Sequence, residues 1–137
     1  MSEHSKAERL SFANQLIRII GSHGRRFFYN KKTGEYARIE LRNGRLWWID
    51  DYKGTPVYLL RTGYGGRWRG FSHGGTMRSL VEDIRDYVRS GRQVPAWKIV
   101  ERSRFADGAR GNIWGYDEES AIAVRAAALA LPIVAAE

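Results

Sequence analysis

Apolar side chains recur every three or four residues between positions 76 and 91, and this is the clearest pattern in the chain. They are Met77, Leu80, Val81, Ile84 and Val88, with Tyr87 at the border of the stripe. Such spacing predicts one buried face of an α-helix, and charged residues fill most of the remaining positions. We expect this amphipathic helix to run from about Thr76 to Ser90, with Thr76 as its N-cap and Gly91 just past its end.

Two further helices are expected towards the ends of the chain. Ser5 and Glu8 have the spacing of a capping box, and the broad apolar stripe that follows is expected to close at a left-handed Gly21. Asp117 is a good N-cap for a C-terminal helix that stops before Pro132. Because residues 121–131 are apolar around most of that helix, we expect it to be buried in the core or in a homodimer.

Between the N-terminal helix and the amphipathic helix at 76–90, apolar residues recur at every second position, which is typical of β-strands. Strands are expected at residues 26–29, 35–42, 45–50, 55–61 and 67–71. After Gly91 we expect a strand at 97–102, a polar loop at 103–112 and a return strand at 113–116. The chain is therefore predicted to be a single α+β domain: an N-terminal helix, a five-stranded antiparallel meander, an amphipathic helix packed on the sheet, an extended segment and a C-terminal helix.

The Asn43-Gly44 pair predicts the strand register, because both central residues of a type I′ turn need positive φ. This turn places Arg42 opposite Arg45, Leu41 opposite Leu46, Glu40 opposite Trp47, Ile39 opposite Trp48 and Arg38 opposite Ile49. The face expected to join the core contains Ala37, Ile39, Leu41, Leu46, Trp48, Val57, Leu59 and Trp68. The outer face mixes arginine with aromatic residues: Tyr36, Arg38, Glu40, Arg42, Arg45, Trp47, Ile49, Tyr58, Leu60, Arg67, Arg69 and Phe71.

Composition narrows the class of protein. The 137 residues contain no cysteine, which excludes a disulfide framework and fits a reducing cytoplasm. The N-terminus lacks the apolar segment of a secretory signal, and the apolar stretch 121–136 is interrupted by Arg125 and Pro132. We therefore expect a cytoplasmic protein that does not enter membranes.

The net charge of +8 is concentrated in two segments. Residues 25–71 carry eleven Lys or Arg against four Asp or Glu, and residues 92–111 carry five against two. Most of these cations are arginine, which suits contacts to phosphate but is also favoured by a GC-rich genome. We expect the protein to come from a GC-rich bacterium or from its phages and mobile elements.

Arginines beside aromatic rings on one sheet face favour a non-enzymatic accessory protein that binds nucleic acid. The candidate binding residues are Arg38, Arg42, Arg45, Trp47, Tyr58, Arg67, Arg69 and Phe71, and the loop residues Arg102, Arg104 and Arg110 form a second group. Two alternatives stay open: residues after 92, with Trp97 and Trp114, cover the face, and the loop arginines are ordinary solvated charges. The second function to consider is docking on an acidic or nucleoprotein partner, for example by an inhibitor from a mobile element.

No arrangement of residues in the sequence predicts catalysis, a cofactor or a metal site. The glycine-rich corner 70–76 lacks the lysine of a P-loop, and the three histidines are too scattered to suggest zinc. Asp50 and Asp51 are adjacent but lie beside a turn, where acids are ordinary. His73 is interpreted as a loop residue. An enzyme that depends on His73 or Asp51 is the third hypothesis.

Overall fold

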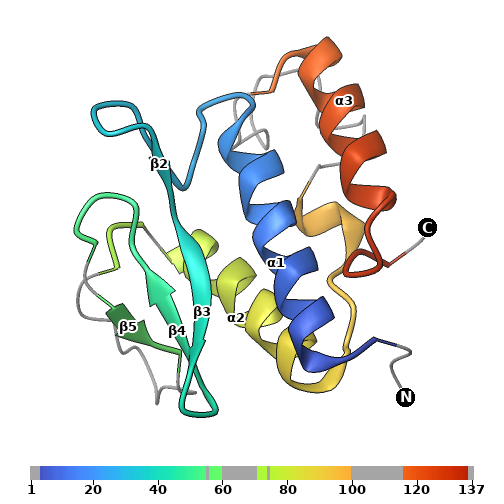
Figure 1. Cartoon of the computed structure of the whole chain (residues 1–137). Helices are drawn as coiled ribbons and strands as arrows, with labels where there is room; N and C mark the ends of the chain where they lie inside the picture. Colours follow the sequence, from blue (N-terminus) through green and yellow to red (C-terminus); the bar gives the residue numbers. More distant parts are fainter. Residues whose placement is uncertain (1–3, 55, 60–70, 74, 100–115, 136–137) are drawn as a thin grey trace.

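The computed structural model describes residues 4–54, 56–59, 71–73, 75–99 and 116–135, and Figure 1 shows their arrangement. Its elements are α1 (Lys6–Gly21), β1 (Tyr29–Asn30), β2 (Glu35–Tyr36), β3 (Arg38–Arg42), β4 (Arg45–Ile49), β5 (Pro56–Tyr58), α2 (Gly75–Ser90), the 3-10 helix η1 (Ala96–Lys98) and α3 (Glu118–Leu129). The helices and the antiparallel strands confirm the predicted α+β class. Within the described residues the strands form two sheets, β1-β2 and β3-β4-β5.

The β3–β4 hairpin has the register that its turn predicts. Asn43 and Gly44 have φ values of 50° and 77°, as a type I′ turn requires. Arg42 pairs with Arg45, and the pairing continues without a slip to Arg38 and Ile49. Because side chains alternate across a strand, this register decides which residues of β3 and β4 face the helices.

Local signals also predict several helix ends. Ser5 Oγ accepts from the amide of Glu8 at 3.1 Å, and Glu8 Oε1 accepts from the amide of Ser5 at 2.8 Å, which completes the capping box. Asp117 caps α3 by accepting from an amide at 2.7 Å, and Gly91 follows α2 with a φ of 83°. The helix α2 begins at Gly75, so the prediction that Thr76 is its N-cap is wrong, and Thr76 lies in the first turn.

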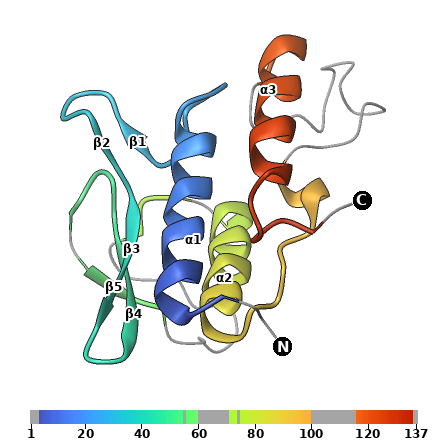
Figure 2. The same ribbon diagram turned by 45° about the vertical axis from the view of Figure 1, so that its right-hand side comes forward.

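The helix α1 lies between the sheet and α3, and α2 packs beside α1 (Figures 1 and 2). The apolar stripe predicted for α2 is buried, and it joins α1, the strands and α3 in a continuous hydrophobic core. Asn14 of α1 accepts from the amide of Ile39 at 2.8 Å and donates to its carbonyl at 3.0 Å. These two bonds satisfy backbone groups of β3 that the hairpin leaves unpaired, and they attach α1 to the sheet.

The chain bends before β1, where the sequence pattern predicts a strand at 26–29. Arg26 and Phe28 have left-handed φ values of 54° and 67°. The guanidinium of Arg26 donates to the carbonyl of Gly21 at 3.1 Å and lies 4.0 Å from the ring centre of Tyr29, while Phe28 is fully buried. These tertiary contacts outweigh the two-residue pattern, and the strand is confined to Tyr29 and Asn30.

Gly21 is required for close packing and not for a left-handed turn. It is the last residue of α1, its φ is not positive, and the backbone continues right-handed into Ser22. A Cβ atom on Gly21 would lie 2.8 Å from Cδ2 of Tyr36. The expected left-handed closure at Gly21 is therefore wrong, and contact with a residue of β2 explains the glycine.

The segment after α2 also differs from the prediction. Residues 96–98 form η1 where the pattern predicts a strand at 97–102, and a parallel bridge joins Val94 to Val134 instead. The predicted loop 103–112 and residues 113–115 of the return strand lie outside the described residues, as do residues 67–70 of the fifth predicted strand. No helix in the described part of the chain is long and apolar enough to cross a bilayer.

Candidate functional site

The three-stranded sheet has one face under the helices and one face away from them. Ala37, Ile39, Leu46, Trp48, Val57 and Leu59 are buried on the first face, as predicted. The prediction also places Leu41 there, but this residue lies near the end of the hairpin and is 39% exposed. Ile49 is buried although its register places it on the outer face.

The predicted position of Phe71 on the outer face is wrong. Its ring centre lies 5.5 Å from that of Trp48, and it packs against the buried core. Trp48 is fully buried on the helix side of the sheet. Phe71 is therefore partly buried against the core, in contact with Trp48, and does not belong to the outer face.

A pair of aromatic rings lies on the outer face of β4 and β5. Trp47 and Tyr58 are opposite each other in the strand register, with ring centres 5.0 Å apart and planes inclined by 31°. Both residues are half-buried. The guanidinium of Arg45 lies 5.6 Å from the centre of the Tyr58 ring. The two rings and this cation form a continuous surface across β4 and β5.

Two arginines of β3 flank a single carboxylate on the same face. Glu40 is 2.8 Å from Nη2 of Arg38 and 2.6 Å from Nη2 of Arg42, and about half of each arginine side chain is exposed, 50% and 49%. The hydrogen bonds from Arg42 and then Arg38 hold the pKa of Glu40 below its ordinary value. One negative charge is therefore shared by two cations, and the group keeps a net positive charge.

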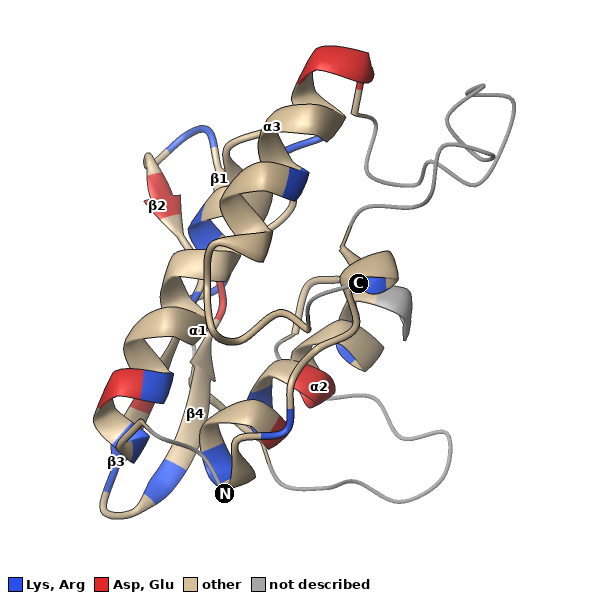
Figure 3. Ribbon diagram, turned by 90° about the vertical axis from the view of Figure 1, so that its right-hand side faces the viewer, with Lys and Arg blue, Asp and Glu red and all other residues tan. Residues whose placement is uncertain are grey.

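A hollow of about 510 Å³ lies at the turn end of the hairpin, lined by Arg42, Asn43, Arg45, Trp47 and Pro56. Figure 3 shows the basic residues that gather at this end of β3 and β4. Arg45 is exposed and has no ion pair within the described residues. The hollow therefore combines cationic groups with one edge of the aromatic pair.

The described residues after position 92 do not cover this face. The helix α3 packs on the far side of α1 (Figures 1 and 2), and Trp97, a suggested cover, is 58% exposed on η1. The second suggested cover, Trp114, lies outside the described residues. So do the candidate binding residues Arg67, Arg69, Arg102, Arg104 and Arg110, whose role stays a prediction. Arg38, Arg42, Arg45, Trp47 and Tyr58 are brought together.

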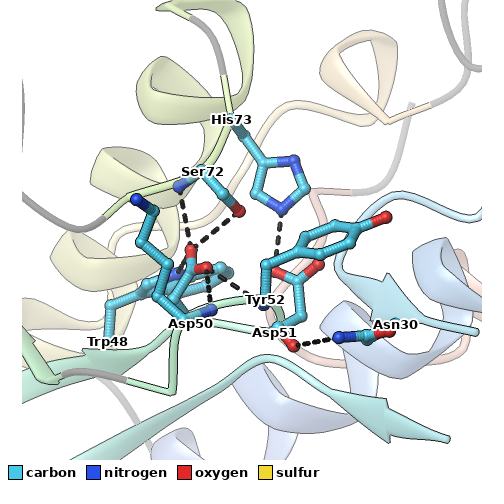
Figure 4. A network of polar contacts seen from close by, with 8 residues as sticks. Asn30, Trp48, Asp50, Asp51, Tyr52, Ser72 and His73 are labelled. Atoms are coloured by element: carbon cyan, nitrogen blue, oxygen red, sulfur yellow. Dashed lines mark hydrogen bonds and ion pairs between the residues drawn. The ribbon is translucent and has the colours of Figure 1, made fainter. Parts of the chain in front are cut away.

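A second cluster forms where β4 ends, shown in Figure 4. Asp50 is buried and accepts five hydrogen bonds: from the amides of Tyr52, Lys53 and Ser72 at 3.0, 3.1 and 3.0 Å, from Ser72 Oγ at 3.1 Å and from Trp48 Nε1 at 3.3 Å. Burial by itself would raise the pKa of Asp50, but these bonds outweigh it and hold the pKa below its ordinary value. Asp50 therefore joins the turn after β4 to the segment that leads into α2.

The neighbouring carboxylate, Asp51, contacts His73. Oδ1 of Asp51 is 2.8 Å from Nε2 of His73, and the two side chains are 0% and 9% exposed. Oδ2 of Asp51 is buried and has no hydrogen-bond partner among the described residues. Leaving such a group unpaired costs about 1–3 kcal/mol and more when it is charged. Asn30 holds the Asp51 backbone by donating to its carbonyl at 3.1 Å.

The sequence analysis considers Asp50, Asp51 and His73 one by one, but it does not predict that they lie together. Asp50 and Asp51 form the only tight carboxylate pair in the strand region, yet His73 is 22 positions further along. Acids near a turn and a histidine in a loop are common, and only the tertiary fold brings them together. The order Asp-Asp at the end of a strand and Ser-His before a helix is the signal that could have suggested contact.

The fold and the outer face define an α+β protein with a basic, aromatic sheet surface. The chain belongs to the YoqU family, whose family model matches residues 3–134. It is similar to the SPbeta prophage-derived uncharacterized protein YoqU of Bacillus subtilis (strain 168), with 32% identity over 125 residues that cover 91% of this chain and 82% of the relative. No solved structure matches the chain. The relative's prophage origin supports the expected bacterial, mobile-element source.

Proposed function

We propose that this protein is a non-enzymatic accessory protein of the bacterial cytoplasm that binds single-stranded nucleic acid on the outer face of β3, β4 and β5. The observation that supports this most is the Trp47–Tyr58 pair with Arg42 and Arg45 beside it, on a face that no described helix covers. Bases stack on aromatic side chains with little regard to sequence, and neighbouring arginines contact the phosphates.

The charge distribution supports the same function. The net charge of +8 favours a polyanionic ligand, because each phosphate contact releases counterions from the nucleic acid. Of the described outer-face arginines, Arg45 forms no ion pair with a described carboxylate, whereas Arg38 and Arg42 share Glu40. Arg45 is thus the cation most available to a phosphate, and Trp47 beside it offers the ring for a base.

The test separates stacking from charge. Binding of a fluorescein-labelled thymidine oligonucleotide is measured by anisotropy at several salt concentrations, with a chelator present. Trp47→Ala is expected to weaken binding by about 1–3 kcal/mol, as the loss of one stacked base would. The slope of log K against log salt should be unchanged, because no phosphate contact is lost.

Trp97 supplies a matched control, because it is an exposed tryptophan on η1, away from the sheet. Trp97→Ala should leave the affinity unchanged. Equal losses in the two variants, or wild-type protein that ignores both DNA and RNA at low salt, would rule out the outer face as a nucleic-acid site.

A second candidate is docking on an acidic or nucleoprotein partner. The hollow lined by Arg42, Arg45 and Trp47 favours it, since acidic side chains could enter beside the two guanidinium groups. A protein that does not bind nucleic acid but captures one protein from its source cell, and loses it on Arg45→Ala, would support this function.

A homodimer through α3, where Ile122 is exposed, is a further proposal that light scattering tests.

A further inference from the structure

Asp51 carries an unpaired carboxylate oxygen inside the folded chain. Its side chain is fully buried, and only Oδ1 has a partner among the described residues, the Nε2 atom of His73 at 2.8 Å. Buried polar atoms nearly always have hydrogen-bond partners, and buried charges are paired or coordinate metals. The free Oδ2 next to an imidazole therefore points to a missing cationic partner.

We propose that Asp51 and His73, with Asp50 beside them, form a binding site for one divalent transition-metal ion. One potential ligand atom from each of the three residues lies within 4.8 Å of the other two. The 2.8 Å separation of Oδ1 and Nε2 is close to that of two ligands about 90° apart around an ion about 2.0–2.1 Å from each. A small shift of the imidazole brings both atoms, or Oδ2 in place of Oδ1, to one ion.

The three residues have different roles in this site. Asp50 already accepts five hydrogen bonds, so it acts mainly as a positioning residue that holds Ser72 against the turn after β4. The bonds from the amide and hydroxyl of Ser72 to Asp50 fix the backbone next to His73. Asp51 and His73 are therefore the primary ligands, and the nearby Asp50 carboxylate adds negative charge.

Aromatic packing keeps the His73 ring in place. The ring centres of Phe28 and Phe71 lie 4.9 and 5.5 Å from that of His73, both in edge-on arrangements. Figure 4 shows one ring nitrogen directed at Asp51 and the other pointing away from the carboxylates. Ligands held in this way need little rearrangement to bind an ion, which favours affinity.

The ligand set also indicates the kind of ion. Neutral imidazole suits zinc and other transition metals, whereas Mg²⁺ and Ca²⁺ prefer oxygen ligands alone. The same two carboxylates without His73 would favour the harder ions. We therefore expect Zn²⁺ to bind most tightly, Mn²⁺ less tightly and Mg²⁺ more weakly still.

The first test is thermal unfolding of the full chain after treatment with a chelator and its removal. Zn²⁺ at about 100-fold above its Kd should raise the melting temperature by roughly 5–10 °C. Asp51→Asn and His73→Gln should abolish the rise. His23→Gln is the matched control, because Nδ1 of His23 bonds the carbonyl of Ile19 and His23 does not belong to the group formed by Asp50, Asp51 and His73, so this variant should retain the rise.

A second measurement uses only the wild-type chain, so that a variant that fails to fold does not decide the outcome. Substoichiometric Mn²⁺ should broaden the ring signals of His73 in the NMR spectrum before those of His4 and His23. Broadening at His4 or His23 first would overturn the proposal, as would the absence of any rise in melting temperature with Zn²⁺ or Mn²⁺. Asp51 and His73 would then form an ordinary hydrogen-bonded pair. The oligonucleotide assay contains a chelator, so failure here leaves the proposed function untouched.

Discussion

The outer face of the three-stranded sheet and the Asp50–Asp51–His73 cluster both place charged groups beside aromatic rings, but they are built in opposite ways. On the outer face, one hairpin and its neighbour bring Arg42, Arg45 and Trp47 together, and the charges are exposed. In the cluster, the end of β4 meets a segment 22 residues further along, and the carboxylates are buried.

This difference separates the exposed arginines, which are available to an external ligand, from the buried Asp50, whose charge holds the fold together. An exposed arginine is screened by water, contributes little to stability and is free to contact another molecule. The buried carboxylate of Asp50 is satisfied within the protein, so its hydrogen-bond partners are part of the structure. Substitutions should therefore affect binding in the first region and stability in the second.

The adjacent tryptophans of β4 give the largest contrast. Trp48→Ala removes a fully buried ring that contacts Phe28 and Phe71, and it should lower the free energy of unfolding by about 3–5 kcal/mol. Trp47→Ala removes a half-buried ring paired with Tyr58 and should cost only about 1 kcal/mol. Urea denaturation measures both. Equal losses would show that Trp47 is covered and that the outer face is not a binding surface.

Asp50→Asn tests the buried cluster and its dependence on pH. The variant keeps the shape but loses a charged acceptor of several hydrogen bonds, so unfolding free energy at pH 7 should fall by about 2–3 kcal/mol. Because the folded pKa of Asp50 is lowered, its stabilisation is complete above the unfolded pKa, near pH 4, and is lost as pH falls through the folded value.

The wild type should therefore lose stability more steeply than Asp50→Asn below about pH 4. Denaturation followed at a series of acidic pH values gives both slopes. Parallel slopes would mean that Asp50 does not release its proton more readily in the folded state.

Arg42→Ala tests the exposed charges, and we expect it to change the free energy of unfolding less than the substitutions above. It should lower the slope of log K against log salt by about one unit for one lost phosphate contact, with a change in unfolding free energy within about 0.5 kcal/mol. Arg92→Ala is the matched control, since Arg92 is exposed and lies after α2, outside the strands of the sheet. The same slope change in Arg92→Ala would indicate binding by overall charge and not by the outer face.

Glu40→Gln should have the smallest effect and the opposite sign. It removes the carboxylate that Arg38 and Arg42 share, so oligonucleotide binding at low salt should become tighter. The exposed ion pairs contribute little, and unfolding free energy should change by less than about 0.5 kcal/mol. Weaker binding would mean that Glu40 positions the two arginines and that their orientation matters more than the charge it cancels.

Several features of the fold can be predicted from short stretches of sequence. Ser5 and Glu8 satisfy each other's amides, and Asn43 and Gly44 accept positive φ without long-range help. The hairpin register follows from that turn, and Trp47 and Trp48 then face opposite sides because strand side chains alternate. For this reason the sequence alone predicts the part of the outer face contributed by β3 and β4, with Arg38, Arg42, Arg45 and Trp47 on one side.

Only the tertiary structure decided the rest, because the interactions concerned join distant parts of the chain. The contact between Asp51 and His73 depends on how the segment before α2 returns to β4, and the inward position of Phe71 has the same cause. Gly21 is explained by a ring of β2, and not by its own backbone. A sequence pattern records the preferences of neighbouring residues, whereas packing selects among the conformations that those preferences allow.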